Sequence, residues 1–339
     1  MSKFFYCLIL CLAGQILLQS CSSMISLSMI SVPEEGGINF VKITDDNDQV
    51  APPEITRQGT MNIGNLTKTT LKWWVNPMVA VSPDGSKIAY ITGKNNMKNI
   101  MVKNAAAGGA STQRTFRNAV YDFSWSPDNK MFCFTEVRSN RFGVYLVNTD
   151  QGSVVQQIGS GTNDFAGVMT MDGKKIFFHR GEGGYANFSL WSFDRETNLF
   201  SNYSRGMTPC LVPGQPNTIY CTRYTDREEC EIWKINIETG VEEVILSQPG
   251  KSFTSPQLSP DGKWLLCTGN SFTEKNKRPN TDIFAVRVDG TSLTQLTYHP
   301  GNDLSAVWSP DGKSIYFLSE RGSTVPDKYY NVWKMDFNL

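Results

Sequence analysis

Short apolar segments alternate with polar tight turns along most of this chain, and few stretches have the spacing of an amphipathic helix. The apolar segments are rich in β-branched and aromatic residues, which favour strands. Many turns read Ser-Pro-Asp-Gly, as in SPDGSKIAY at 82–90 and SPDGKWLLC at 259–267. Proline presets φ at the second turn position, and Asp and Gly complete the reversal. The pattern predicts an all-β protein made of hairpins.

The turn recurs at a nearly constant interval. Its aspartates are Asp84, Asp128, Asp172, Asp261 and Asp311, and the long gap after Asp172 is about two intervals. A degenerate copy, VPGQPNTIYC, lies in that gap at 212–221. A second motif, a strand with a large side chain at its second position, follows every turn, at 100–104, 144–148, 190–194, 232–236, 283–287 and 332–336. Two motifs in one register predict six repeats of about 44 residues.

Each repeat reads as four short strands. One such sheet cannot bury both of its faces, whereas radial packing buries each face against the next sheet and protects the edges. We therefore predict an all-β, six-bladed β-propeller of four-stranded antiparallel blades, closed by an N-terminal strand. The last repeat stops after its third strand, so the closing strand comes from upstream. We favour 61–71 (MNIGNLTKTTL), because of its distance to the first turn, over the alternative 38–44 (INFVKIT).

The N-terminal residues form a different kind of segment. Lys3 is followed by an apolar run to about Leu18, which is short for a membrane span and typical of a secretory signal. The run ends in Leu-Gln-Ser-Cys, which resembles the lipobox of bacterial lipoproteins, where the cysteine is acylated; an ordinary signal with an incidental Cys21 is the alternative. We predict a signal peptide at 1–20, a lipid on Cys21, a tether at 21–60 and the propeller at 61–339.

The repeated WSPDGK motif, together with Ile-Trp-Lys-Met-Asp and Gln-Leu-Thr, resembles the Pro-Asp-Gly propeller repeats of TolB and related proteins over roughly 62–339. The resemblance implies the fold more specifically than the function. TolB-like proteins carry an N-terminal α/β domain for which this chain has no room, and we do not extend a Tol–Pal role to it. Prolyl-oligopeptidase-like enzymes use similar repeats, but the chain has no Gly-x-Ser-x-Gly motif.

Composition excludes several functions. The chain has 32 basic and 32 acidic residues with no basic cluster, which argues against a nucleic-acid partner. His179 and His299 are the two histidines and have no metal-ligand spacing, so we expect no metal and no cofactor. Besides Cys21, the mature chain has five cysteines, most of them in apolar strand patterns, and Cys210 with Cys221 or Cys230 is the candidate disulfide.

Candidate binding residues lie in the loops opposite the Ser-Pro-Asp-Gly turns, because a rigid scaffold presents its binding residues on loops. These loops interleave arginines and tyrosines, which are enriched at protein interfaces and in anionic-ligand sites. The alternative is a solvated surface of ordinary ion pairs. The candidates are Arg138, Arg141, Arg180, Tyr185, Arg223, Tyr224, Arg321, Tyr329 and Tyr330. Asp164 and Asp303 precede their turns equally and are candidates for the central channel, with capping of the loop backbone as the alternative.

We therefore expect a lipid-anchored envelope propeller that docks partner proteins and is not an enzyme. No aspartate or acidic cluster follows Cys21, so the expected location is the outer membrane, facing the periplasm, with the cell surface as the alternative. The alternative functions are binding of a small anionic ligand or glycan at the loop face or central channel, and, less favoured, a propeller lyase or glycosidase.

Overall fold

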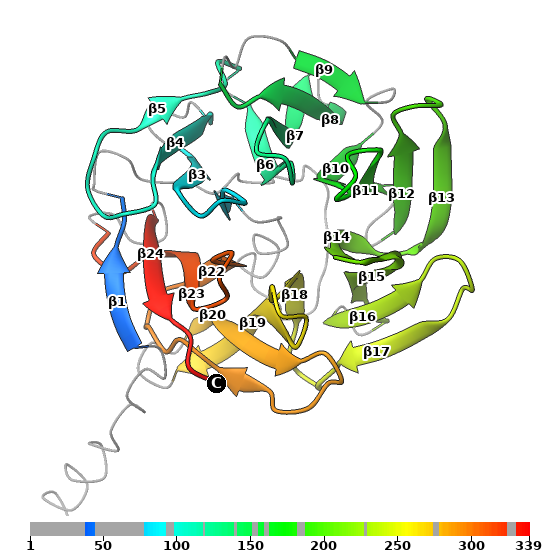
Figure 1. The fold of residues 1–339 in the computed structure, drawn as a ribbon. Helices are drawn as coiled ribbons and strands as arrows, with labels where there is room; N and C mark the ends of the chain where they lie inside the picture. Colours follow the sequence, from blue (N-terminus) through cyan, green and yellow to red (C-terminus); the bar gives the residue numbers. More distant parts are fainter. Residues whose placement is uncertain are drawn as a thin grey trace, which may run out of the picture. The chain divides into compact units, whose positions relative to one another are not determined.

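A computed structural model describes residues 38–44, 78–92, 98–117, 119–138, 141–150, 155–158, 163–181, 187–226, 229–273, 278–323 and 330–339. These residues form six four-stranded antiparallel sheets, arranged as the blades of a ring (Figure 1). The predicted all-β six-bladed propeller is confirmed. The described part of the chain includes no helix with the length and apolar character needed to span a bilayer.

Each blade runs from an innermost first strand to an outermost fourth strand, in chain order for the first five blades. Blade 1 is β2 (Val79–Val81), β3 (Lys87–Ile91), β4 (Ile100–Asn104) and β5 (Thr112–Gln113); blade 2 is β6 (Val120–Trp125), β7 (Met131–Arg138), β8 (Arg141–Asn148) and β9 (Val155–Ile158); blade 3 is β10 (Asp164–Met169), β11 (Lys175–Gly181), β12 (Phe188–Asp194) and β13 (Phe200–Arg205). Blade 4 is β14 (Met207–Val212), β15 (Gln215–Tyr224), β16 (Cys230–Asn236) and β17 (Glu242–Leu246); blade 5 is β18 (Phe253–Leu258), β19 (Trp264–Thr273), β20 (Arg278–Arg287) and β21 (Thr294–Gln295); blade 6 is β22 (Asp303–Trp308), β23 (Ser314–Ser319), β24 (Asn331–Asp336) and β1 (Ile38–Lys42).

The ring closes through β1, which pairs with β24 as the fourth strand of the last blade. The preference for 61–71 was therefore wrong and the alternative, 38–44, holds; residues 61–71 lie outside the described part. Side-chain contacts explain the choice: Phe40 packs edge-on against Phe317, and Ile43 is buried in the core. The Lys103 ammonium also donates to the carbonyl of Ile43. These contacts join positions far apart in the chain, which no spacing argument reveals.

The Ser-Pro-Asp-Gly turns all lie on one side of the ring, here called the turn face; the other side is the upper face. In the last of them Ser309 donates to Asp311 Oδ1 at 2.6 Å and accepts from the backbone N–H of Ser314 at 2.9 Å. The same arrangement recurs in blades 1, 2, 3 and 5. The Ser82 hydroxyl lowers the pKa of Asp84 to about 2. The turn aspartates therefore hold hairpins.

Neighbouring blades are joined by a repeated backbone feature near the channel. In blades 3, 4 and 5 the first strand has a bulge whose first residue has a positive φ, and its N–H donates to a side chain of the preceding blade. The pairs are Ala166 to Thr135, Thr208 to His179 and Ser255 to Thr222. A positive φ at a non-glycine residue costs on the order of 1 kcal/mol. The inter-blade hydrogen bonds offset that cost.

The five described cysteines are buried and free. No disulfide joins Cys210 to Cys221 or to Cys230, which corrects the candidate pairing. Cys221 is in the core between blades 3 and 4, and Cys210 Sγ accepts from the backbone N–H of Leu258 in blade 5. Burial raises the pKa of the Cys210 thiol to about 11. These thiols act as small core side chains.

Candidate functional site

A cavity of about 800 Å³ lies in the turn-face half of the central channel. The innermost strands of all six blades and their turns form its walls, and the lining is mainly apolar. The lining includes Val79, Val81, Trp125, Met169, Leu211, Val212, Leu258, Val307 and Trp308, together with the prolines 83, 127, 209, 213, 216, 260 and 310. Concave, mainly apolar cavities of this size are typical ligand or partner sites.

The cavity extends outwards between blades 3 and 4. Lys174, Lys175 and Asp194 line it on the blade 3 side, and Pro216, Asn217 and Ile237 line it on the blade 4 side. Blade 4 carries the degenerate turn, which lacks the serine, the aspartate and the lysine of the other copies. The cavity therefore extends past the turn that departs most from the repeat.

Exposed apolar side chains border the same side of the turn face. Met171 lies in the β10–β11 turn, Leu199 before β13 and Val241 before β17, and each is about two-thirds exposed. Met171 also lines the cavity, whereas Leu199 and Val241 precede the outermost strands of blades 3 and 4. Exposed apolar residues beside an apolar cavity are typical of interaction sites. This surface and the cavity together are the candidate functional site.

Many polar groups at the cavity are already engaged. The Ser124 hydroxyl donates to the carbonyl of Gly167 at 2.6 Å, and Trp308 Nε1 donates to the carbonyl of Gln257 at 3.0 Å. Hydrogen bonds from Thr170 and from the backbone of Thr197 hold the pKa values of Asp172 and Asp194 below their usual range. These carboxylates stabilise turns, and the chemistry of the site is apolar contact.

On the upper face, two predicted arginines pair with the two predicted channel aspartates. Arg180 donates to both oxygens of Asp164, at 2.6 and 3.0 Å, and its guanidinium lies 4.3 Å from the centre of the Trp191 ring. Arg321 pairs with Asp303 at 3.1 Å and lies over Phe40 of the closing strand. Burial raises the pKa of Asp164, and the hydrogen bonds from Arg180 oppose that rise. These pairs connect strands within their blades.

Arg138 and Arg223 are held in a similar way. Arg138 donates to Glu136 and lies over Tyr145. Arg223 lies over Trp233 and donates to both oxygens of Glu242 at 2.7 Å. In blades 2, 3 and 4 an arginine lies over the aromatic residue of the third strand. This recurrence indicates a structural role for these arginines.

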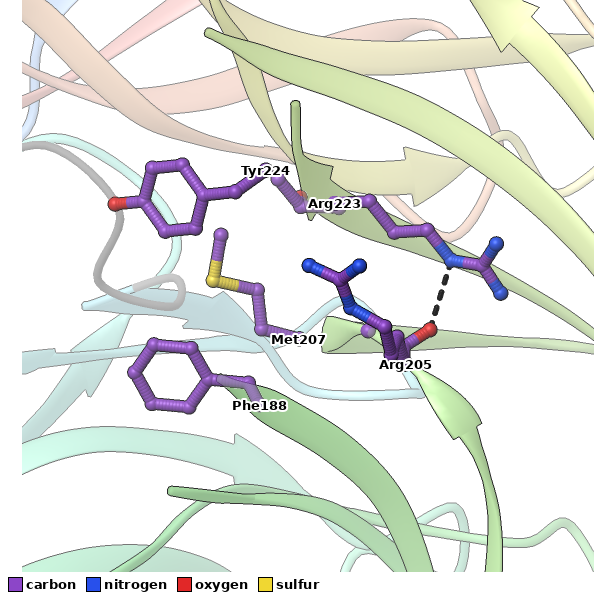
Figure 2. Close-up of a pocket in the computed structure, with 7 residues that line it drawn as sticks. Phe188, Arg205, Met207, Arg223 and Tyr224 are labelled. Atoms are coloured by element: carbon purple, nitrogen blue, oxygen red, sulfur yellow. Dashed lines mark hydrogen bonds between the residues drawn. The ribbon is translucent and has the colours of Figure 1, made fainter. Parts of the chain in front are cut away.

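Figure 2 shows the small pocket that Arg223 and Tyr224 line with Phe188 and Met207, where Arg223 donates to the carbonyl of Arg205. Its volume is about 10 Å³, which is room for one water molecule. Tyr330 is buried, whereas Arg141 is exposed at the start of β8. Tyr185, Tyr329 and Cys21 lie outside the described residues. The structure thus brings several upper-face candidates into ion pairs and leaves a larger cavity on the turn face.

Two buried titratable groups lie near the channel. His179 is packed between Phe165 and Phe188, accepts at Nδ1 from the backbone of Thr208, and has its pKa lowered to about 3 by burial. Burial raises the pKa of Asp122 to about 6. His179 is therefore neutral at physiological pH. Among the described residues no group of three His, Cys, Asp or Glu could hold a metal ion.

The model of the TolB beta propeller domain family matches residues 14–230 and 207–336. The chain belongs to this family, as the Pro-Asp-Gly repeats predicted. The Tol-Pal system protein TolB of Wolinella succinogenes is 33% identical over 107 residues, which are 32% of this chain and 23% of that protein. The chain spans only about a tenth to a third of the length of the curated relatives that it matches.

Solved structures share the fold. TolB from Acinetobacter baumannii has a TM-score of 0.60 at 14% identity, covering 75% of this chain and 64% of that one. An oligogalacturonate lyase from Vibrio parahaemolyticus has a TM-score of 0.55 at 12% identity, covering 89% and 97%. A fold shared between these two proteins does not decide between binding and catalysis.

The turn-face cavity was not predicted from the sequence. The degenerate copy VPGQPNTIYC keeps the register of the repeat but departs from the sequence of the other turns. Loss of the charged turn residues in one copy only, next to Met171, Leu199 and Val241, was the available clue.

Proposed function

We propose that this protein is a lipid-anchored, non-catalytic interaction module of the bacterial envelope, which docks its partner on the turn face. The observation that carries the proposal is the side chain of Met171, which is 68% exposed at the edge of the turn-face cavity, with Leu199 and Val241 exposed in turns of blades 3 and 4 on the same face. Burial of such side chains is the main favourable contribution to protein association.

Membership of the TolB propeller family supports an envelope role, since relatives carry the name Tol-Pal system protein. The predicted lipid on Cys21 adds an anchor, expected in the outer membrane and facing the periplasm. A non-catalytic role is supported by the apolar lining of the cavity and by the buried, neutral state of His179. The partner is therefore proposed to be another envelope protein.

Site-specific photo-crosslinking in cells tests this proposal. A photoreactive amino acid at position 171, on the turn face, is compared with one at position 116, where Phe116 is equally exposed on the upper face. Position 171 should give discrete adducts with an envelope protein, and position 116 should give few. Adducts from position 116 alone would place the docking surface on the upper face and overturn the assignment.

The anchor is tested separately. Cys21→Ala should release the protein from membrane fractions, because the acyl chains that anchor it in the bilayer can no longer be attached. A Cys221→Ala variant is the control, since that thiol is buried in the propeller core. Retention of Cys21→Ala in the membrane fraction would exclude the lipid anchor while leaving the docking surface untouched.

A further inference from the structure

The turn-face cavity suits a hydrocarbon ligand better than a peptide. Seven of its lining residues are prolines, which have no backbone N–H. Ser124 and Trp308 already donate to backbone carbonyls, and the serines and aspartates of the turns bond to one another. A peptide in this cavity would bury amide groups with few partners, which is costly. A hydrocarbon chain has no such groups to satisfy.

The described propeller begins on the same face as the cavity. Ile38 pairs with Asp336, and Asp336 pairs with Ser314, the first residue of β23 after its turn. The chain that precedes Ile38 therefore joins the propeller at the turn face. Residues 22–37 span at most about 60 Å when fully extended. If Cys21 is acylated, the face that carries the cavity is also the face from which the anchor starts.

The degenerate turn gives this cavity an uncharged wall. In blades 3, 5 and 6 the turn places an aspartate and a lysine at the rim, as with Asp261 and Lys263. In blade 4 the corresponding segment, 212–217, has no charged residue. On the blade 4 side an apolar chain therefore meets no charged side chain, whereas Lys174, Lys175 and Asp194 line the blade 3 side.

We propose that the turn-face cavity binds the acyl chain of a membrane lipid, drawn from the membrane to which the protein is anchored. This proposal rests on the lipid anchor of the proposed function and assigns a ligand to the cavity beside its docking surface. The bound chain lies along Trp125, Leu258 and Trp308, with its polar head at the rim.

Fluorescence quenching in vesicles tests the proposal with the mature, lipidated protein. It is reconstituted in phosphatidylcholine vesicles whose acyl chains are dibrominated, because bromine quenches tryptophan only at contact range. We expect quenching relative to unbrominated vesicles, at least halved in the double variant Trp125→Phe/Trp308→Phe. Equal quenching in the wild type and the double variant would show that other tryptophans meet the lipid and would overturn the proposal.

A charge in the cavity gives the second arm. Gln257 lines the cavity, and Gln257→Glu keeps its size while adding a carboxylate, so quenching should fall at least two-fold. Gln248→Glu makes the same change between β17 and β18 at the upper face and should leave quenching unchanged. The proposal is wrong if Gln257→Glu behaves like Gln248→Glu, or if an uncharged apolar heptapeptide abolishes the quenching at equimolar lipid.

The two proposals fail differently. If the protein does not float with the vesicles at all, the anchor of the proposed function is wrong, and the acyl-chain proposal, which rests on it, is wrong as well. If it floats through Cys21 but Trp125 and Trp308 show no quenching, only the acyl-chain proposal is wrong. Thermal unfolding by circular dichroism verifies that each variant is folded.

Discussion

The two faces of this propeller use their polar residues differently. On the upper face, charged side chains reach across strands: Arg180 binds Asp164, and Arg321 binds Asp303 and covers Phe40. On the turn face, the serine and threonine hydroxyls of the turns bond within about five residues, as Ser309 does with Asp311. The difference matters for function, because long-range ion pairs occupy the arginines that suggested a binding site, whereas local turn bonds leave the apolar cavity uncovered.

The comparison teaches that residue type alone misplaces a site in a repeat protein. Arginine and tyrosine are enriched at interfaces. Arginine also stabilises contacts between strands of one blade, since guanidinium groups pair with carboxylates and stack on aromatic rings. In this chain Arg180 and Arg223 do both within their own blades. The repeated position of their aromatic partners, Trp191 and Trp233, is the sign of a structural role.

The largest effect should come from breaking an upper-face pair. Arg180→Ala leaves the buried carboxylate of Asp164 without its partner and should destabilise the fold by about 3–5 kcal/mol. Urea unfolding followed by circular dichroism measures the change. The control is Lys174→Ala, which removes a solvent-screened surface pair with Glu196 and should cost much less. Similar losses of unfolding free energy in the two variants would mean that the buried pair contributes no more to stability than the surface pair.

Asp122 also tests the cost of a buried carboxylate oxygen without a partner, because its Oδ1 has no hydrogen-bond partner among the described residues. Burial raises its pKa from 3.8 to about 6, so the folded state binds the proton more tightly than the unfolded state. This contribution to stability is present below about pH 4 and is lost as the pH rises through 6, by on the order of 3 kcal/mol. Asp122→Asn should remove that loss.

The measurement for Asp122 is the difference in unfolding free energy between the wild type and Asp122→Asn from pH 4 to 8. His179 has the opposite dependence, because its lowered pKa makes stability fall as the pH drops below about 6.5. His179 contributes equally to the wild type and to Asp122→Asn, so its contribution cancels in the difference between their unfolding free energies. A difference independent of pH would show that Asp122 titrates normally.

A turn-face hydrogen bond should matter less. Ser309→Ala removes the hydroxyl that bonds both Asp311 and the backbone of Ser314, and should cost about 1 kcal/mol. Ser201→Ala, at an exposed position of β13, is the control and should change stability by less than about 0.5 kcal/mol. Chemical denaturation at pH 7 compares them. If Ser309→Ala matches its control, the turn network adds nothing to stability.

The smallest effect on stability is expected at the exposed rim. Met171→Ser should change the unfolding free energy by less than about 0.5 kcal/mol, because the side chain is 68% exposed. It should nevertheless weaken capture of the partner by a crosslinker at position 241, since apolar contact is lost. Leu339→Ser, at an exposed residue after β24, is the control. Unchanged capture in Met171→Ser would remove this residue from the docking surface.

The sequence by itself determined the repeat number, the four-strand blade and the structural role of the turn aspartates. Those features rest on contacts within one hairpin, where Ser82, Asp84 and the following backbone are neighbours in the chain. Local contacts of this kind leave a direct signature in residue order. The degenerate fourth copy is identifiable because its strand residues keep the register of the other repeats.

Only the tertiary structure decided which segment closes the ring, which charges are neutralised and where the cavity lies. Ile38 and Asp336 pair across almost the whole chain, and Arg321 reaches Phe40 on that same closing strand. Such contacts depend on closure of the ring, and a one-dimensional pattern carries no distance between its ends. The cavity arises because six innermost strands converge, which no single repeat can show.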